Sequence, residues 1–84
     1  MRVEFFGVSR ERSGVSELHV QARTLGELLG QLAVQYPALA ELLPDNRLHP
    51  ALAANLNGDR FVRDPLTPLN DRDCLLILSA DAGG

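Results

Sequence analysis

Apolar and polar residues alternate at the start of the chain. Val3 and Phe5 alternate with Arg2 and Glu4, which is the two-residue period of a half-buried β-strand. A first strand is therefore predicted over residues 1–8.

The next segment predicts a hairpin. Residues 9–14 are a polar stretch that ends in glycine, so a turn is expected there. A second short strand follows over residues 15–20, and the close spacing of the two strands is typical of a hairpin.

A helix is predicted after Thr24. Glu27 follows this threonine three residues later and stands directly before an apolar run, which is the spacing of a capping box. The apolar positions then recur with helical spacing, at Leu25, Leu28, Leu29, Leu32 and Ala33. Such a stripe packs against a sheet. The helix is expected to end at Tyr36, because the residue before a proline avoids the helical conformation.

The second half of the chain contains only short elements. Residues 37–50 read as a connection with one or two further helical turns, and strands are expected at 51–56, 61–62 and 74–78. No second long helix covers the other face of the sheet, so the order of elements indicates an α+β fold. If the first and last strands pair at the centre, the layout is the β-grasp, or ubiquitin-like, fold. This is a mixed four- to five-stranded sheet with one main helix on one face.

The composition restricts the class of protein to which the chain can belong. Eighty-four residues with a hydrophobic fraction of 45% predict a single domain over residues 1–84. The one cysteine, Cys74, cannot form an internal disulfide. The start of the chain lacks the apolar segment of a signal peptide, and no apolar run approaches the ~20 residues of a membrane span. We therefore expect a cytoplasmic protein with no membrane partner.

The charged and nucleophilic residues form no recognisable catalytic or metal-binding set. All eight basic residues are arginines, scattered among eleven acidic residues, which argues against nucleic-acid binding. His19 and His49 have no partners at ligand spacing, and Cys74 has no activating neighbour in the sequence. The absence of lysine also excludes isopeptide bonds onto the side chains of this chain.

The C-terminal segment contains only small residues. Residues 79–84 read Ser-Ala-Asp-Ala-Gly-Gly and are expected to be a flexible tail. Fully extended, Asp81 to Gly84 reach roughly 13 Å, enough to enter the active site of another protein. Termini also fray and often end in small residues, so the tail alone does not decide between a functional end and a frayed one.

Strand parity predicts a docking surface beside this tail. In the last strand, Leu75 and Ile77 are expected in the core, and Leu76 and Leu78 on the open sheet face beside Phe6. Three exposed apolar side chains would form a partner site; the alternative is a core that uses both faces of the strand. Several aspartates could also contact a basic partner, although such charges often only solvate a surface. These residues are Asp59, Asp64, Asp71, Asp73 and Asp81.

Several of these features together resemble the ubiquitin-like sulfur carriers, the family of the molybdopterin synthase small subunit and the thiamine sulfur carrier protein. The resemblance rests on an opening strand with a Phe-Phe pair, Thr24-Leu25 before a leucine-striped helix, Leu56-Asn57-Gly58, Leu69-Asn70-Asp71-Arg72-Asp73 and the terminal Gly83-Gly84. The segment over residues 37–50 looks more like that of the molybdopterin synthase subunit. Family members often have glycine where Arg72 stands, and a positive φ there would be unfavourable for arginine.

The resemblance implies a carrier rather than an enzyme. A ubiquitin-activating-type adenylyltransferase would use ATP to adenylate the carboxylate of Gly84, which would then become a thiocarboxylate and donate sulfur inside a synthase such as the molybdopterin synthase large subunit. Gly83 and Gly84 would carry this chemistry, and Phe6, Leu76, Leu78, Asp81 and Ala82 would contact the partners. The chain itself would bind no cofactor and no metal. Supply of sulfur for thiamine, cysteine or a secondary metabolite, conjugation to other proteins as a modifier, and a plain interaction module remain alternatives.

Overall fold

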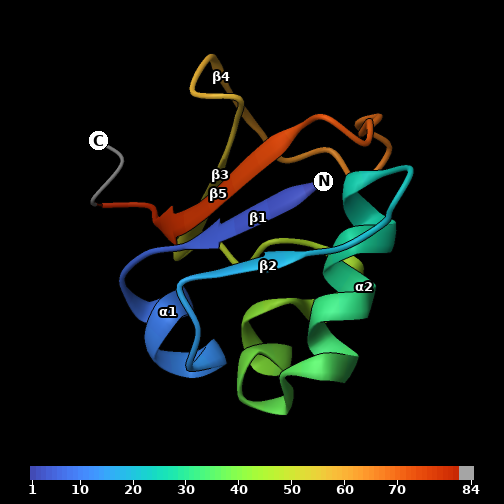
Figure 1. Ribbon diagram of the computed structural model, residues 1–84. Helices are drawn as coiled ribbons and strands as arrows, with labels where there is room; N and C mark the ends of the chain where they lie inside the picture. The colour runs from blue at the N-terminus through green and yellow to red at the C-terminus, as the bar shows by residue number, and fades with distance from the viewer. Residues whose placement is uncertain (82–84) are drawn as a thin grey trace.

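The computed structural model describes residues 1–81, which form one mixed sheet with the helical segments on one of its faces (Figure 1). The five strands are β1 (Arg2–Phe5), β2 (Glu17–His19), β3 (Leu52–Leu56), β4 (Arg60–Val62) and β5 (Cys74–Ser79). Their order in the sheet is β2-β1-β5-β3-β4. The first and last strands pair in parallel at the centre, and the other pairs are antiparallel. The predicted β-grasp fold is confirmed.

The main helix, α2 (Leu25–Gln35), begins where the capping box predicts. The hydroxyl oxygen of Thr24 accepts a hydrogen bond from the backbone N–H of Glu27 at 3.2 Å. The carboxylate of Glu27 accepts from the backbone N–H of Arg23 at 3.4 Å. These bonds satisfy donors that would otherwise lack partners at the start of the helix.

The core lies between α2 and the inner face of the sheet. The four leucines of the helical stripe are fully buried, as are the inward-facing residues of the central strands, Val3 and Leu75. Burying a leucine side chain stabilises the fold by about 1.5–3 kcal/mol. Tyr36 closes the C-terminal end of α2, where its ring packs edge-on against Phe5 with 6.0 Å between centroids. The apolar stripe of the helix therefore fixes which face of the sheet is covered.

The connection between α2 and β3 contains two short 3₁₀ helices, η1 (Pro37–Leu42) and η2 (Pro44–Asn46). They match the further helical turns expected in this segment. Leu39 and Leu43 bury their side chains in the core from here. Arg12 pairs with Glu41, which links this segment to the start of the chain.

The prediction of a polar turn over residues 9–14 is wrong. A six-residue helix, α1 (Val8–Ser13), follows β1, which ends at Phe5 instead of reaching Val8. Gly7 precedes α1 with a φ of 69°, and Gly14 ends it with a φ of 77°, conformations that glycine adopts at little cost. β1 and β2 still pair as the predicted antiparallel hairpin, with α1 in the connection.

Arg72 does not have the positive φ that would strain its backbone. Among the described residues, the non-glycine positions with positive φ are Asp45, Asn46 and Asn57. Asparagine and aspartate tolerate this conformation better than other residues. Arginine at position 72 therefore carries no backbone penalty.

Candidate functional site

The sheet face turned away from the helices is the candidate docking surface, and we call it the open face. The register of the sheet brings together on it residues from the two ends of the chain, because β1 and β5 are adjacent. The residues assigned to the open face by alternation and register are Arg2, Glu4, Phe6, Ala53, Asn55, Phe61, Cys74, Leu76 and Leu78.

The apolar part of the open face lies beside the end of β5. Phe6 follows β1 directly and is 56% exposed, and Leu76 is half-buried on β5. Leu75 and Ile77 lie in the core as predicted, with exposures of 0% and 1%.

The expected exposure of Leu78 is wrong, because only 9% of this residue is accessible. Leu78 is not part of the main core cluster, so its side chain is on the open face as expected, but it is covered there instead of exposed. It pairs with Ala53 of β3 on one side, and on the other side lies Phe6, whose backbone N–H donates to the carbonyl of the preceding Ile77 at 3.0 Å. Side chains of a central strand are flanked from both sides in this way. A partner would reach Phe6 and Leu76 first.

Sequence reasoning missed Phe61. This residue of β4 is 57% exposed and pairs with Asn55 of β3. Its neighbour Val62 is buried, and adjacent residues of a strand face opposite sides, so strand alternation would have placed Phe61 on the outer side. Its alignment with Asn55 follows only from the strand pairing.

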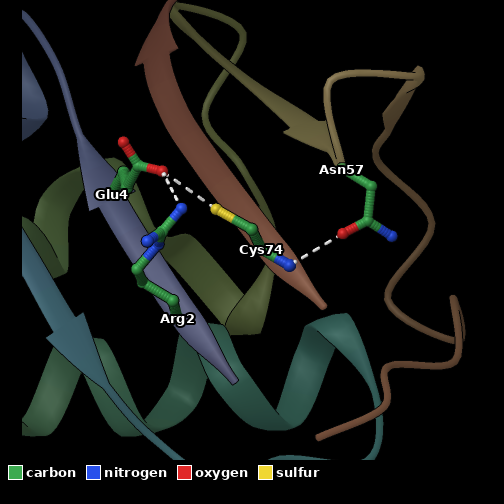
Figure 2. Close-up of polar contacts among 4 residues, drawn as sticks. All are labelled: Arg2, Glu4, Asn57 and Cys74. Atoms are coloured by element: carbon green, nitrogen blue, oxygen red, sulfur yellow. Dashed lines mark hydrogen bonds and ion pairs between the residues drawn. The ribbon is translucent and has the colours of Figure 1, made fainter. Parts of the chain in front are cut away.

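The opposite end of the open face is polar (Figure 2). The Cys74 thiol donates to Oε1 of Glu4 at 3.0 Å, and the Arg2 guanidinium lies 3.2 Å from the same oxygen. Partial burial, together with the hydrogen bond to Glu4, raises the pKa of the Cys74 thiol. A raised pKa disfavours the thiolate, which is the nucleophilic form.

Asn57 fixes the start of β5. Its side-chain oxygen accepts from the backbone N–H of Cys74 at 2.8 Å, and its side-chain amide donates to Asp73 at 2.9 Å. The hydrogen bond from Asn57, followed by one from the backbone of Asn70, lowers the pKa of the Asp73 carboxyl. Asn57 and Asp73 thus close the turns at this end of the sheet.

Cys74 and the C-terminal segment lie at opposite ends of β5. The strand runs from Cys74 to Ser79, so these residues are roughly 17 Å apart at ~3.3 Å per residue. The thiol is therefore remote from the point where the chain leaves the sheet.

The strand continues further into the segment 79–84 than the sequence suggested. Ser79 belongs to β5, and the backbone N–H of Ala80 donates to the carbonyl of Ala51 at 2.8 Å. Asp81 is exposed. Ala82, Gly83 and Gly84, to which the sequence assigned partner contacts and chemistry, lie outside the described residues.

The expected acidic surface divides into two kinds of residue. The carboxylates of Asp73 and Asp64 accept hydrogen bonds from the backbone N–H groups of Asn70 and Leu66, although Asp64 is exposed. Asp59 and Asp71 are also exposed. Within residues 1–81, no group of three His, Cys, Asp or Glu side chains is placed to hold a metal ion. In the same part of the chain, no helix has the length and apolar character needed to cross a membrane.

Comparison with known protein families identifies the chain. The model of the ThiS family matches residues 3–84. The chain belongs to the ThiS family. This is a family of ubiquitin-like sulfur carriers, and the β-grasp fold of the chain agrees with this assignment. No curated protein matches the chain significantly.

Solved structures with the same fold include proteins of three kinds. Small archaeal modifier protein 1 from Methanosarcina acetivorans has 25% identity and a TM-score of 0.78, with 99% of this chain and 94% of that chain covered. A chain of the BexX/CysO complex from Amycolatopsis orientalis has 24% identity and a TM-score of 0.78, covering 99% and 98%. A chain of the complex of subunits 1 and 2 of molybdopterin-converting factor from Helicobacter pylori has 28% identity and a TM-score of 0.65, covering 99% and 96%. Two of these neighbours were solved bound to partner proteins.

Proposed function

We propose that this chain is a cytoplasmic sulfur carrier whose C-terminal Gly84 is adenylated and then converted to a thiocarboxylate. The match to the ThiS family carries this proposal, because it extends through Gly83 and Gly84. In this function the chain is a co-substrate, and the catalytic groups belong to its partners.

The chemistry explains why an activating enzyme is required. A carboxylate is a poor electrophile because its oxygen is a poor leaving group. A ubiquitin-activating-type adenylyltransferase joins the Gly84 carboxylate to AMP from ATP and releases pyrophosphate. A sulfur nucleophile then displaces AMP. Glycine suits this end of the chain because no Cβ shields the carbonyl and both signs of φ are accessible.

The position of the apolar part of the open face supports docking of a partner beside the tail. Phe6 and Leu76 are accessible near the end of β5, and the chain leaves the sheet after Ala80. From there four residues, Asp81 to Gly84, reach roughly 13 Å when extended. An extended segment of this kind binds through main-chain hydrogen bonds, with little need for side-chain pockets.

Within this function we propose that the receiving enzyme is molybdopterin synthase, of which this chain is the small subunit. Support comes from the 28% identity to a chain of molybdopterin-converting factor. The segment over residues 37–50, which resembles the corresponding part of that subunit in sequence, adds to it. A test is complementation: the gene should restore molybdenum cofactor synthesis in cells that lack their own small subunit, and not thiamine synthesis in cells that lack the thiamine carrier. The reverse pattern would reassign the pathway and leave sulfur carriage intact.

The sharpest test of sulfur carriage is the intact mass of the chain after co-expression with its adenylyltransferase and a sulfur source. The wild-type mass should increase by the difference between sulfur and oxygen. Deletion of Gly84 should abolish the increase, while circular dichroism should stay unchanged because the deletion leaves β5 intact. A wild-type chain that never gains this mass with its cognate activator would refute the proposal.

A second candidate is protein modification, which the similarity to small archaeal modifier protein 1 favours. The activated Gly84 carbonyl would then be attacked by a lysine of another protein. Because this chain has no lysine, an attached copy offers no side-chain amine for a further copy. Covalent adducts should therefore carry single copies at each acceptor lysine, and a ladder built through side chains of this protein would contradict this reading.

A further inference from the structure

β1 leaves the sheet before β5 ends, which leaves one side of β5 without a neighbouring strand. The parallel register of the two strands ends with Phe5 opposite Ile77. β5 continues to Ser79, and β3 accompanies it on the other side up to the pair Leu52–Ser79. The last residues before the tail therefore need another neighbour on the β1 side.

The first turn of α1 and the residues just before it occupy this place. Ser9 is fully buried, with 0% exposure. Its hydroxyl donates to the carbonyl of Ile77 at 2.7 Å and accepts from the backbone N–H of Phe6 at 3.2 Å. The bond between Ser9 and Ile77 joins residues 68 positions apart in the sequence. It reinforces the last pair of the β1–β5 register, where the backbone N–H of Phe6 also donates to the carbonyl of Ile77 at 3.0 Å.

Gly7 completes the contact by leaving room for β5. A Cβ at this position would lie 3.0 Å from the hydroxyl oxygen of Ser79 and 3.9 Å from its Cβ. Gly7 also has a φ of 69°, which side chains other than hydrogen disfavour. The end of β5 thus runs closely past Gly7, and a side chain there would be strained by the positive φ and would require the Ser79 hydroxyl to shift.

On the other side of β5, Ala80 bonds to Ala51 at 2.8 Å. The end of the strand is therefore bonded up to Ala80 on the β3 side and up to Ile77 on the β1 side. Each residue of extended chain spans about 3.3 Å. If the strand frayed by one residue, the anchor point of the tail would move by about that distance.

We propose that Ser9 and Gly7 are positioning residues for the chemistry at Gly84: they fix the point at which the tail leaves the sheet and thereby place the terminal carbonyl in the partner's active site. This inference rests on the proposed function of Gly84. Neither residue is assigned a part in the bond changes at Gly84. Displacement of reacting groups by about 1 Å can cost on the order of a hundredfold in rate, so control of the exit point matters for a reaction at the end of a narrow tail.

The test compares Ser9→Ala with Ser13→Ala. Both changes remove a serine hydroxyl from α1, but the Ser13 hydroxyl is exposed and bonds only to Arg10 and Val15. Adenylation by the cognate adenylyltransferase is measured as pyrophosphate release. Ser9→Ala should lower kcat on the order of tenfold and leave KM within about twofold, because Phe6 and Leu76 still dock. Ser13→Ala should leave both parameters unchanged.

A double-mutant cycle separates positioning from general loss of structure. One glycine is inserted between Asp81 and Ala82, in the wild-type chain and in Ser9→Ala. The insertion should slow the wild-type chain more than it slows Ser9→Ala, because the exit is already loose in the variant. Effects on kcat that simply multiply would overturn the inference, since independent sites behave additively in free energy.

Hydrogen exchange at the Ala80 amide tests, without any enzyme, whether Ser9 fixes the end of β5. Ser9→Ala should reduce its protection on the order of tenfold more than it reduces that of Leu28 in α2, and Ser13→Ala should not. Equal loss at both amides would overturn the inference. If Ser9→Ala fails to fold, Ser9→Cys replaces the hydroxyl by a larger thiol that is only a weak donor, and it should show a smaller loss that is still selective for Ala80. A wild-type chain that is never adenylated contradicts the proposed function, whereas an unchanged Ala80 amide contradicts the role of Ser9.

Discussion

Replacing Phe6 by alanine tests whether the apolar part of the open face is the docking surface. Phe6 is 56% exposed, and a phenylalanine presents roughly 200 Å² in total. About 110 Å² of its surface is therefore available to a partner. At ~25 cal/mol per Å², complete burial of this surface contributes about 3 kcal/mol to binding. Alanine retains part of it, so the loss should be about 2 kcal/mol, or roughly a 30-fold rise in Kd.

The assay is titration calorimetry of the chain with its adenylyltransferase or synthase partner. Leu66→Ala is the matched control. Leu66 is 79% exposed, and it lies in the loop whose Pro65 accepts a hydrogen bond from Gly26 of α2, away from the open face. Its Kd should stay within about twofold of the wild-type value, because surface substitutions outside an interface have small effects.

Thermal unfolding of both variants checks that weaker binding does not simply reflect a loss of folded protein. The covered part of Phe6 contributes at most about 2 kcal/mol to the stability of the fold, so Phe6→Ala should remain folded at the assay temperature. A Phe6→Ala chain that is folded and binds its partner with wild-type affinity would refute the assignment of this surface. Equal weakening by Phe6→Ala and Leu66→Ala would refute it as well.

Further predictions concern the core and the polar end of the open face. Leu75→Ala removes a fully buried side chain, and should cost about 2–5 kcal/mol in urea unfolding, a large share of the stability of a domain this small; a cost below about 1 kcal/mol would contradict the packing. The Asp73 pKa is lowered, first by its bond from Asn57, so the carboxylate stabilises the fold above the unfolded-state pKa and this contribution is lost as pH falls through the lower folded value. Asp73→Asn should therefore flatten the fall in stability on acidification, and an unchanged pH profile would contradict it. Burial and then Glu4 raise the pKa of Cys74, so Glu4→Gln should speed alkylation of Cys74 near pH 8; slower alkylation would contradict this origin of the shift.

The local elements of this fold were predictable from the sequence because short-range physics determines them. The capping bond between Thr24 and Glu27 joins residues three positions apart, and the leucine stripe of α2 needs only the helical period. The alternation that placed Leu75 and Ile77 in the core needs only the two-residue period of a strand. The central pairing of the first and last strands followed from the order of elements and the single helix. The chemistry proposed for Gly84 follows from the diglycine and the family resemblance.

The tertiary structure decided the features that depend on residues far apart in the sequence. The helix α1 stands where a turn was predicted, and its buried Ser9 bonds to Ile77, 68 positions away. Leu78 is covered although its parity is outward, because β3 lies on one side of it and the residues that follow β1 lie on the other. Glu4 meets Cys74 across 70 positions. A period along one strand determines which way a side chain points, whereas its exposure and its partners depend on which strands lie beside it, and long-range pairing alone determines that.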